Sequence, residues 1–548
     1  MVKQKFDSII IGGGHNGLVT AIKLAKAGQR VLVLEAKDQF GGAAVTRGLA
    51  PGYNISAAAH LLHLLPKKLQ RELRLEQFGL VLAAQNLKTI ALDLAGNHVV
   101  FDGKNLSGGT AADQSHYPTY HRDMQELARF FAPLLASRAP RLARGKHEPH
   151  ARAEKLRDAC NLAMTGLRLR LLGRRRMRQM LRIIGMNAYD LVDEHFESPL
   201  VKGAIALDAV IGTEFAPRTP GTVISYLYRL GAEYAAGNSL AQPQGGMGSV
   251  SAALVKAAEA AGVTLKLKSP VARILVSRAD SSQGYDDEYA PDYASGVVTV
   301  NGTEYHANHI VSNVDPKTTV LQLAGPQHFD TDFVRRINNI RMKGVSGKLH
   351  LALKALPEFK GLSRLELGNR LLIAPSSEAI ERAIDPTKYG EFAEQPVLEI
   401  TIPTLADPSL APAGTHLLSA VVVGIPTELK GGWKAESRKA LLKNVMAVLE
   451  SYAPGIGKLV VQSELLTPSD IAEEFALPGG CWHQGSLTFD QFYFMRPTYG
   501  ASQYQTPLKG LYLCGAGNHP GGGVMGLAGY NAAQQVLRHP IKNQNSKG

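Results

Sequence analysis

The stretch that decides the fold is Phe6-Asp-Ser-Ile-Ile-Ile-Gly12-Gly-Gly14-His-Asn-Gly17, close to the N-terminus. Residues 6–11 form an isoleucine-rich run of the kind found in strands buried on both faces of a parallel sheet. The glycine pattern follows directly, then a helix-compatible stretch to Gly28, and a second apolar run, 30–34, that ends at Glu35. This order of strand, glycine turn, helix, strand and acid predicts a Rossmann-like dinucleotide-binding fold.

Each position of this pattern has a physical task. Gly12 permits the tight turn, Gly14 lets a pyrophosphate approach the backbone, and Gly17 lets the helix pack closely on the strand. The helix N-terminus meets the negative charge of the pyrophosphate. Glu35 is placed to accept hydrogen bonds from the ribose hydroxyls of the adenosine.

The residues after Glu35 distinguish FAD from NAD. The segment 39–47 carries the pair Gly41-Gly42 and a polar turn directly after the ribose acid. Such a turn keeps the chain near the pyrophosphate and guides an extended FAD toward its flavin ring. An ordinary Gly-Gly loop is the alternative when this motif is considered alone.

A second glycine-rich segment, Leu511-Tyr-Leu-Cys-Gly515-Ala-Gly517-Asn-His519-Pro-Gly521-Gly-Gly523, lies near the C-terminus. It predicts a short strand over 511–514, a sharp turn, and a helix within 524–537. Its glycines let backbone amides face a ligand, and the helix N-terminus adds partial positive charge there. If both glycine-rich segments touch one flavin, the two ends of the chain meet in space.

Length and composition limit the alternatives. A chain of 548 residues predicts two or three domains. Cys160, Cys481 and Cys514 form no Cys-x-x-Cys pair and no zinc spacing, so we expect neither a thiol relay nor a metal. The first strand leaves no room for a signal peptide, and no apolar run is long enough to span a bilayer. We therefore expect a cytoplasmic protein, or one peripheral to the cytoplasmic face of a membrane.

The net charge of +13 is concentrated in the segment 168–182, which has no acidic residue. Met177, Met180, Leu181 and Ile184 follow one helical face. The arginines are Arg168, Arg170, Arg174, Arg175, Arg176, Arg178 and Arg182. This pattern suits an anionic membrane surface, or equally a solvated arginine face over a stripe that packs on another domain. Nucleic acid is disfavoured because no aromatic residues alternate with the arginines.

The motifs also carry a family resemblance. The segment 35–47 with Pro51-Gly52-Tyr53 resembles the N-terminal motif of the phytoene desaturase and amine oxidase flavoprotein superfamily. The segments 479–497 and 511–531 are similar to those of phytoene-dehydrogenase-related proteins within it. The resemblance covers essentially the whole chain and is strongest at 6–66, 241–316 and 479–537. The chain departs from the family pattern at Asn518, where threonine is expected, and at Gln484, which follows His483.

The resemblance implies an α/β fold: a Rossmann-like FAD-binding domain of the glutathione-reductase and amine-oxidase type with an inserted α+β substrate domain. The segment 242–248 follows a loop and not a strand, so we expect no second nicotinamide domain. The predicted FAD-binding segments are 1–75, 238–319 and 479–540; the substrate segments are 76–237 and 320–478; 541–548 is a tail.

The FAD-binding residues are predicted from the two motifs, with Val271 implied by the resemblance as a backbone contact to the adenine. They are Gly12, Gly14, His15, Asn16, Gly17, Glu35, Ala36, Gly41, Gly42, Ala43, Ala44, Val271, Gly515, Ala516, Gly522, Gly523 and Val524.

Candidate catalytic residues lie in the C-terminal motifs. His519 is a candidate for proton transfer, and a loop-fixing role is an equal alternative. His483 and Arg496 are expected to shape the pocket or to hold a polar end of the substrate. Asp490 is expected to cap a helix or to pair with Arg496, and His60 and His63 to be packed in the interior.

These features predict an FAD-dependent oxidoreductase that desaturates or dehydrogenates a hydrophobic, lipid- or isoprenoid-like substrate by hydride transfer to flavin N5. Two alternatives are an amine-oxidase-like reaction on a small polar amine and a flavin-stabilised regulatory protein with little catalysis. The sequence leaves the oligomeric state and the electron acceptor open.

Overall fold

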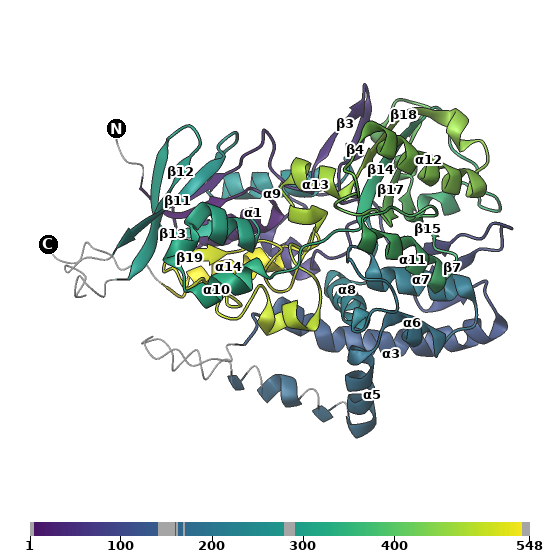
Figure 1. Cartoon of the computed structure of the whole chain (residues 1–548), viewed down its shortest axis with the longest axis horizontal. Helices are drawn as coiled ribbons and strands as arrows, with labels where there is room; N and C mark the ends of the chain where they lie inside the picture. The colour runs from purple at the N-terminus through teal and green to yellow at the C-terminus, as the bar shows by residue number, and fades with distance from the viewer. Residues whose placement is uncertain are drawn as a thin grey trace.

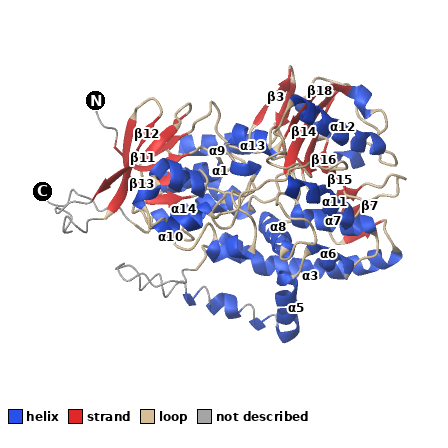
Figure 2. Cartoon of the chain, in the orientation of Figure 1, coloured by secondary structure: helices blue, strands red, loops and turns tan. Residues whose placement is uncertain are grey.

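The computed structural model describes residues 5–140, 159–160, 163–167, 170–171, 173–278 and 291–539 (Figure 1). The predictions for Arg168 and for the tail 541–548 lie outside the described residues. Two sheets dominate the molecule, one near the chain termini and one at the opposite end, with a layer of helices beneath the second (Figure 2).

The first sheet joins three distant parts of the chain. β1 pairs in parallel with β2 on one side and with β13 on the other. Two strands pair with the other edge of β13. β12 is antiparallel to its first half, and β19 is parallel to its last residues. The strands are β1 (Lys5–Ile11), β2 (Val31–Leu34), β10 (Thr264–Lys266), β11 (Val271–Arg278), β12 (Asp292–Thr299), β13 (Glu304–Ser312) and β19 (Leu511–Leu513). The parallel core and the β11–β12–β13 meander confirm the predicted Rossmann-like fold.

Helices from the two ends and from the middle of the chain cover one face of this sheet. They are α1 (His15–Lys26), α9 (Gly248–Ala260) and α14 (Leu527–Val536). α1 and α14 approach so closely that a Cβ on Gly529 would overlap the Asn16 carbonyl oxygen. The Thr20 hydroxyl donates to that carbonyl and to the Gly529 carbonyl, at 2.9 and 3.0 Å. The contact joins the N-terminal helix to the C-terminal one.

The second sheet has the order β18-β14-β17-β16-β15-β6-β7-β8. Its strands are β6 (Thr89–Ala91), β7 (Val99–Asp102), β8 (Asn105–Ser107), β14 (Ser346–Leu353), β15 (Arg370–Ile373), β16 (Val397–Thr401), β17 (His416–Val423) and β18 (Val460–Leu466). Leu349 and Leu351 pack on the face covered by α12 (Ala435–Tyr452). The alternating residues Lys348 and His350 therefore point to the opposite face.

The helical layer lies on that opposite face of the second sheet. Val421 and Val423 of β17 share a core with α3, α7 and α8. The helices of this part are α3 (Ala111–Ala136), α5 (Gly173–Gly185), α6 (Ala188–Asp193), α7 (Pro199–Val210), α8 (Thr222–Ala236) and α11 (Ser377–Ile384). Smaller elements complete the fold: β3 (Thr46–Ala50), β4 (Tyr53–Ser56), α2 (Lys67–Leu73), β5 (Leu82–Ala84), β9 (Gln242–Pro243), α10 (Thr331–Asn338) and α13 (Pro468–Phe475).

The strands of each sheet come from separate segments. β1 and β2 lie within 1–75, β10 to β13 within 238–319, and β19 within 479–540. The strands of the second sheet lie within 76–237 and 320–478. The exact domain boundaries stay a prediction.

The basic helix α5 projects from the helical layer at the bottom of Figure 1. Met180 and Ile183 are buried at 3% and 2% exposure, whereas Leu181 is 59% exposed. The predicted apolar stripe is therefore wrong at Leu181. The face of the helix that packs against the protein contains Met180 and Ile183, and Leu181 lies outside it. Arg174 and Arg178 are exposed on the outer face. None of the helices in the described part of the chain is both long and apolar enough to cross a membrane.

Candidate functional site

A cavity of about 610 Å³ is lined by loops of the first sheet and by residues of the second. This volume is within the range of small-molecule sites. Most of the predicted FAD-binding residues form its wall: Gly12, Gly14, His15, Asn16, Glu35, Ala36, Gly41, Gly42, Ala43, Ala44, Val271, Ala516, Gly523 and Val524.

The three remaining predicted cofactor residues lie just behind this wall. A Cβ on Gly17 would overlap the Gly12 carbonyl, which is the close helix–strand packing expected of this position. A Cβ on Gly515 would lie 2.6 Å from the Asn313 carbonyl oxygen, and one on Gly522 would overlap the Trp482 backbone. These glycines position the wall by close backbone packing.

The N-terminus of α1 opens into the cavity. The helix begins at His15, its N-cap residue Gly14 makes no side-chain capping bond, and its first turn contains no acidic residue. Because both Gly14 and His15 line the cavity, the free backbone amides of this turn are available to an anion. This arrangement fits a pyrophosphate.

Glu35 is held rigidly at the end of β2. Its Oε2 accepts a hydrogen bond of 2.7 Å from the Gly13 amide, and its Oε1 accepts one of 2.9 Å from the Lys37 amide. The carboxylate lines the cavity and keeps further lone pairs for a ligand. This position fits the ribose hydroxyls of an adenosine.

The two glycine-rich motifs meet at this cavity. Ile310 to Ser312 of β13 pair with β1 on one side and with β19 on the other. His15 of the first motif and Gly523 of the second line the same cavity, and the Gly523 backbone opposes the lowering of the His15 pKa. Burial lowers the pKa of His15 to about 4, so its ring is neutral at pH 7.

The two departures from the family pattern lie at the joint between the C-terminal motifs. The Gln484 side-chain oxygen accepts a hydrogen bond of 3.0 Å from the Gly517 amide, and Gln484 also lines the cavity. Asn518 is 1% exposed, and its side-chain amide donates to the Gly515 carbonyl at 3.2 Å. Both residues stabilise the turn that holds Ala516 against the cavity.

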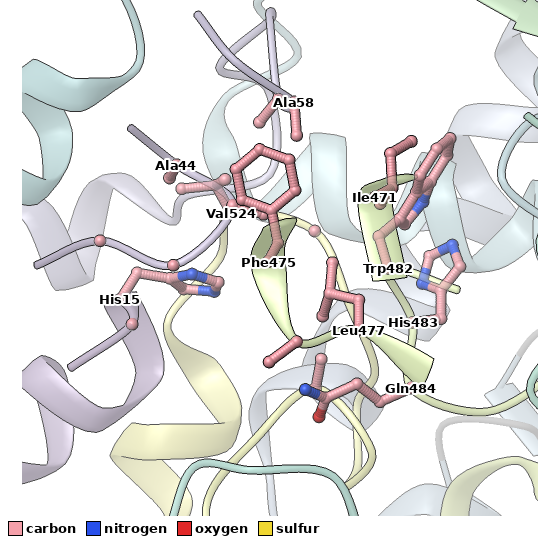
Figure 3. Close-up of a pocket in the computed structure, with 18 of the residues that line it drawn as sticks. His15, Ala44, Ala58, Ile471, Phe475, Leu477, Trp482, His483, Gln484 and Val524 are labelled. Atoms are coloured by element: carbon pink, nitrogen blue, oxygen red, sulfur yellow. The ribbon is translucent and has the colours of Figure 1, made fainter. Parts of the chain in front are cut away.

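One wall of the cavity is aromatic and apolar (Figure 3). Phe475 is the last residue of α13, Leu477 follows the helix, and Trp482 and His483 lie next along the same segment. Burial, and then the charge of Arg496, lower the pKa of His483 to about 3. His483 is thus a neutral member of the wall, and its role toward the substrate stays a prediction.

His519 does not line the cavity. It is fully buried, its Nε2 lies 2.9 Å from the Leu134 carbonyl oxygen of α3, and its ring packs edge-on against Tyr493. Burial lowers its pKa to about 4. This placement matches the loop-fixing role; the proton-transfer role has no contact with the cavity wall.

Arg496 is an internal clamp. Its side chain is 1% exposed and donates to backbone carbonyls of both C-terminal motifs, including Gly485 and Ala516 at 3.2 and 3.0 Å. With its donors engaged by the backbone, it holds no substrate end. The expectation that it contacts the substrate directly is wrong, because the two turns it joins enclose it completely.

One further expectation is corrected by the structure. Asp490 does not pair with Arg496; it lies in the first turn of the short 3-10 helix Phe489–Gln491 and forms an ion pair of 2.7 Å with Arg341 at the surface. His60 and His63 are buried as expected, and both also line the cavity. Burial lowers the pKa of His60 to about 4 and that of His63 to about 3.

Several residues that line the cavity lie outside the sequence motifs and were not predicted. Asn313, at the end of β13, lines the cavity beside Gly12. A polar group, formed by Asp208, Arg229, Lys348 and Glu399, lies in the substrate segments. Burial lowers the pKa of Lys348 to about 7. The sequence signal for this lysine was a charged residue two positions before His350 in a leucine-rich strand.

Comparisons with known proteins agree with this geometry. Residues 17–537 match the family described as flavin containing amine oxidoreductase. Rat pyridine nucleotide-disulfide oxidoreductase domain-containing protein 2 is 32% identical over 99% of this chain and 95% of its own. One of the limonene dehydrogenase subunits of Castellaniella defragrans is 26% identical over 98% and 95%. An engineered variant of putrescine oxidase has a similar fold, with a TM-score of 0.60 at 17% identity, over 98% of this chain and 99% of that one.

The family match, the uncapped helix N-terminus, the ribose acid and the joined glycine motifs point to one cofactor. The chain belongs to the flavin-containing amine oxidoreductase family, and it is an FAD-dependent oxidoreductase.

Proposed function

We propose that this enzyme dehydrogenates or desaturates a hydrophobic, lipid- or isoprenoid-like substrate. The observation that carries the proposal is the apolar wall of the cavity beyond the FAD-binding motifs. It consists of Ala209, Ile211, Val421, Phe475, Leu477, Trp482 and Leu487. Such a surface binds an apolar molecule by removing it from water.

The cofactor supplies the redox chemistry: when bound, FAD accepts a hydride from a substrate C–H bond at N5. The residues of the chain bind the substrate, orient it and exclude water. Phe475 and Leu477 close one side, and the neutral ring of His483 lies beside them (Figure 3). The relationship to a component of limonene dehydrogenase supports an isoprenoid-like substrate.

An amine-oxidase-like reaction on a small polar amine is the alternative. It requires carboxylates that are free to hold an ammonium group. In the described residues, Asp208, Glu399 and Glu474 of the cavity wall are each paired with an arginine. The similarity to amine oxidase structures concerns the fold, and a fold does not determine the substrate.

We also propose that the enzyme works at an anionic membrane surface. Met164, Leu167 and Leu171, at helical spacing, are 50%, 49% and 76% exposed. The outward arginines of α5 follow them along the chain. Exposed apolar side chains beside a basic helix face suit an interface of anionic lipids, where a lipid-like substrate would reside.

The substrate proposal is tested by anaerobic mixing of the purified holoenzyme with limonene or with putrescine, followed by flavin absorbance. We expect the apolar compound to bleach the flavin and the diamine to leave it oxidised. Bleaching by the diamine alone would contradict the proposal and favour the amine reaction.

A further inference from the structure

The cavity ends in a polar pole within the substrate domain. We define this pole by the residues that line it or pair with those that do: His60, Asp208, Arg229, Glu233, Lys348, Arg370 and Glu399. They come from five separate elements and from the loop after β4. Lys348, Arg370 and Glu399 are buried and the other four are half-buried, so the groups they leave unpaired indicate what the cavity binds.

Each carboxylate of this pole forms an ion pair with an arginine. The buried Arg370 guanidinium donates to Glu399 at 2.6 Å and pairs with Asp208 at 2.5 Å. Arg229 pairs with Asp208 at 3.1 Å and with Glu233 at 2.9 Å. Among the described residues of the pole, no carboxylate is therefore left for a cationic ligand.

Three polar atoms at this end of the cavity lack a partner in the described structure: Lys348 Nζ, His60 Nδ1 and the Nδ1 of His63, whose Nε2 lies 3.9 Å from Glu233. Lys348 is 2% exposed, and its Nζ makes no hydrogen bond. His60 Nε2 lies 2.9 Å from Glu399 Oε1, which places the ring proton on Nε2 and leaves Nδ1 as an acceptor without a donor. A buried donor and a buried acceptor are thus both available to a ligand.

The strand register sets the spacing of these groups. Lys348 of β14 and Glu399 of β16 both pair with Val421 of β17, so all three side chains share one face of the sheet. Two strand spacings, about 10 Å, separate the lysine backbone from the glutamate backbone. A ligand over Val421 has the Lys348 amine on one side and the His60–Glu399 pair on the other.

We propose that this pole binds a hydroxyl group of an otherwise apolar substrate. The Lys348 amine donates to the hydroxyl oxygen, and the hydroxyl donates to His60 Nδ1. A cationic amine would meet Lys348 and two arginines with no free carboxylate, and a hydrocarbon would leave both polar atoms unpaired. The inference rests on the proposed hydrophobic substrate and names its polar group.

The test is a titration of the holoenzyme, monitored by flavin difference absorbance, with 1-decanol, decyl methyl ether and decylamine. The ether accepts a hydrogen bond but cannot donate one. We expect decanol to bind roughly tenfold more tightly than the ether and more tightly than the amine. Decylamine binding as tightly as decanol, or no saturable response to decanol, would overturn the inference.

Variants assign the effect to the pole. Lys348→Met removes the donor and keeps the side-chain length, and we expect it to weaken decanol binding about tenfold. Lys348→Arg retains a donor and should recover part of the affinity. Lys354→Met, at an exposed position directly after β14, is the matched control. Unchanged decanol affinity in Lys348→Met would overturn the assignment.

The outcomes separate this inference from the proposed function. If flavin is bound and reduced by apolar hydrocarbons while decanol shows no advantage over the ether, the hydroxyl site is wrong and the function stands. If no apolar compound reduces the flavin, the proposed function fails.

Discussion

Glu35 shows how one side chain can couple the cofactor to the sheet. Its carboxylate is fixed by the amides of Gly13 and Lys37 while it faces the cavity. The glycine turn and the ribose site therefore depend on the same group.

Replacing Glu35 by alanine should weaken FAD binding about tenfold to a hundredfold, because hydrogen bonds to a charged acceptor are lost. Calorimetric titration of FAD into the apoprotein measures the change. Glu76→Ala, at an exposed position in the same part of the chain, should leave the affinity unaltered. Equal affinities in wild type and Glu35→Ala would exclude the ribose role.

Lys348 gives a pH-dependent prediction. Burial lowers its pKa from the ordinary 10.5 to about 7. At low pH, folding must therefore take a charged amine out of water, and this costs stability. The penalty is full below pH 7 and declines as the pH rises from 7 toward 10.5. Lys348→Met should therefore raise the Tm most at pH 6 and progressively less up to pH 9. A gain that is independent of pH between these values would show that the lysine is not desolvated in the folded protein.

At the scale of elements, α5 has one buried face and one exposed basic face. Its inner side chains Met180 and Ile183 anchor it to the helical layer, and its outer arginines remain in solvent. Packing within the protein accounts for Met180 and Ile183, so the proposed membrane binding rests on the arginines and on the exposed Met164, Leu167 and Leu171 before the helix.

The double variant Arg174→Glu/Arg178→Glu should lose most of its binding to vesicles of phosphatidylglycerol and phosphatidylcholine in a sedimentation assay, because attraction to anionic lipids is reversed. Arg364→Glu/Arg382→Glu makes the same charge change at exposed positions elsewhere and is the control. Loss of vesicle binding in both double variants would mean that net charge alone, and not α5, determines binding. If neither double variant lost vesicle binding, the membrane proposal would be wrong.

The contact between α1 and α14 gives a packing prediction. Gly529→Ala places a methyl group against the Asn16 carbonyl and should lower the free energy of unfolding by about 1–3 kcal/mol. Gly185→Ala, at the exposed end of α5 where a Cβ meets nothing within 4 Å, is the matched control in chemical denaturation. A Gly529→Ala protein as stable as the control variant would mean that the helices do not pack this closely.

For the whole molecule, the predictable features are those encoded by neighbouring residues. The strand–glycine–helix segment around Gly12 and the strand before Gly515 follow from local periodicity and turn chemistry, and the structure places both around one cavity. His483 was also correctly placed, because it lies inside a contiguous motif.

The features that could not be predicted depend on contacts between distant residues. The motif left His519 equally open to proton transfer and to loop fixing, and the structure distinguishes the two because the Leu134 carbonyl of α3 lies against its ring. Asp490 pairs with Arg341 and not with Arg496, and this contact also joins residues that are distant in the sequence. The polar pole brings together positions from His60 to Glu399, and only strand register shows that Lys348 and Glu399 share a face.

The central claim is that both ends of the chain form one FAD site. The most direct test is the FAD affinity of a Gly523→Val variant, measured by calorimetry beside wild type. Gly523 lines the cavity with a positive φ of 97°, so a side chain there strains the backbone and its Cβ overlaps the Leu64 side chain of the cavity wall. The account predicts a loss of FAD affinity at least as large as in Glu35→Ala, in a protein whose circular dichroism is unchanged. Wild-type FAD affinity in Gly523→Val would contradict it, because the N-terminal motif would then hold the cofactor alone.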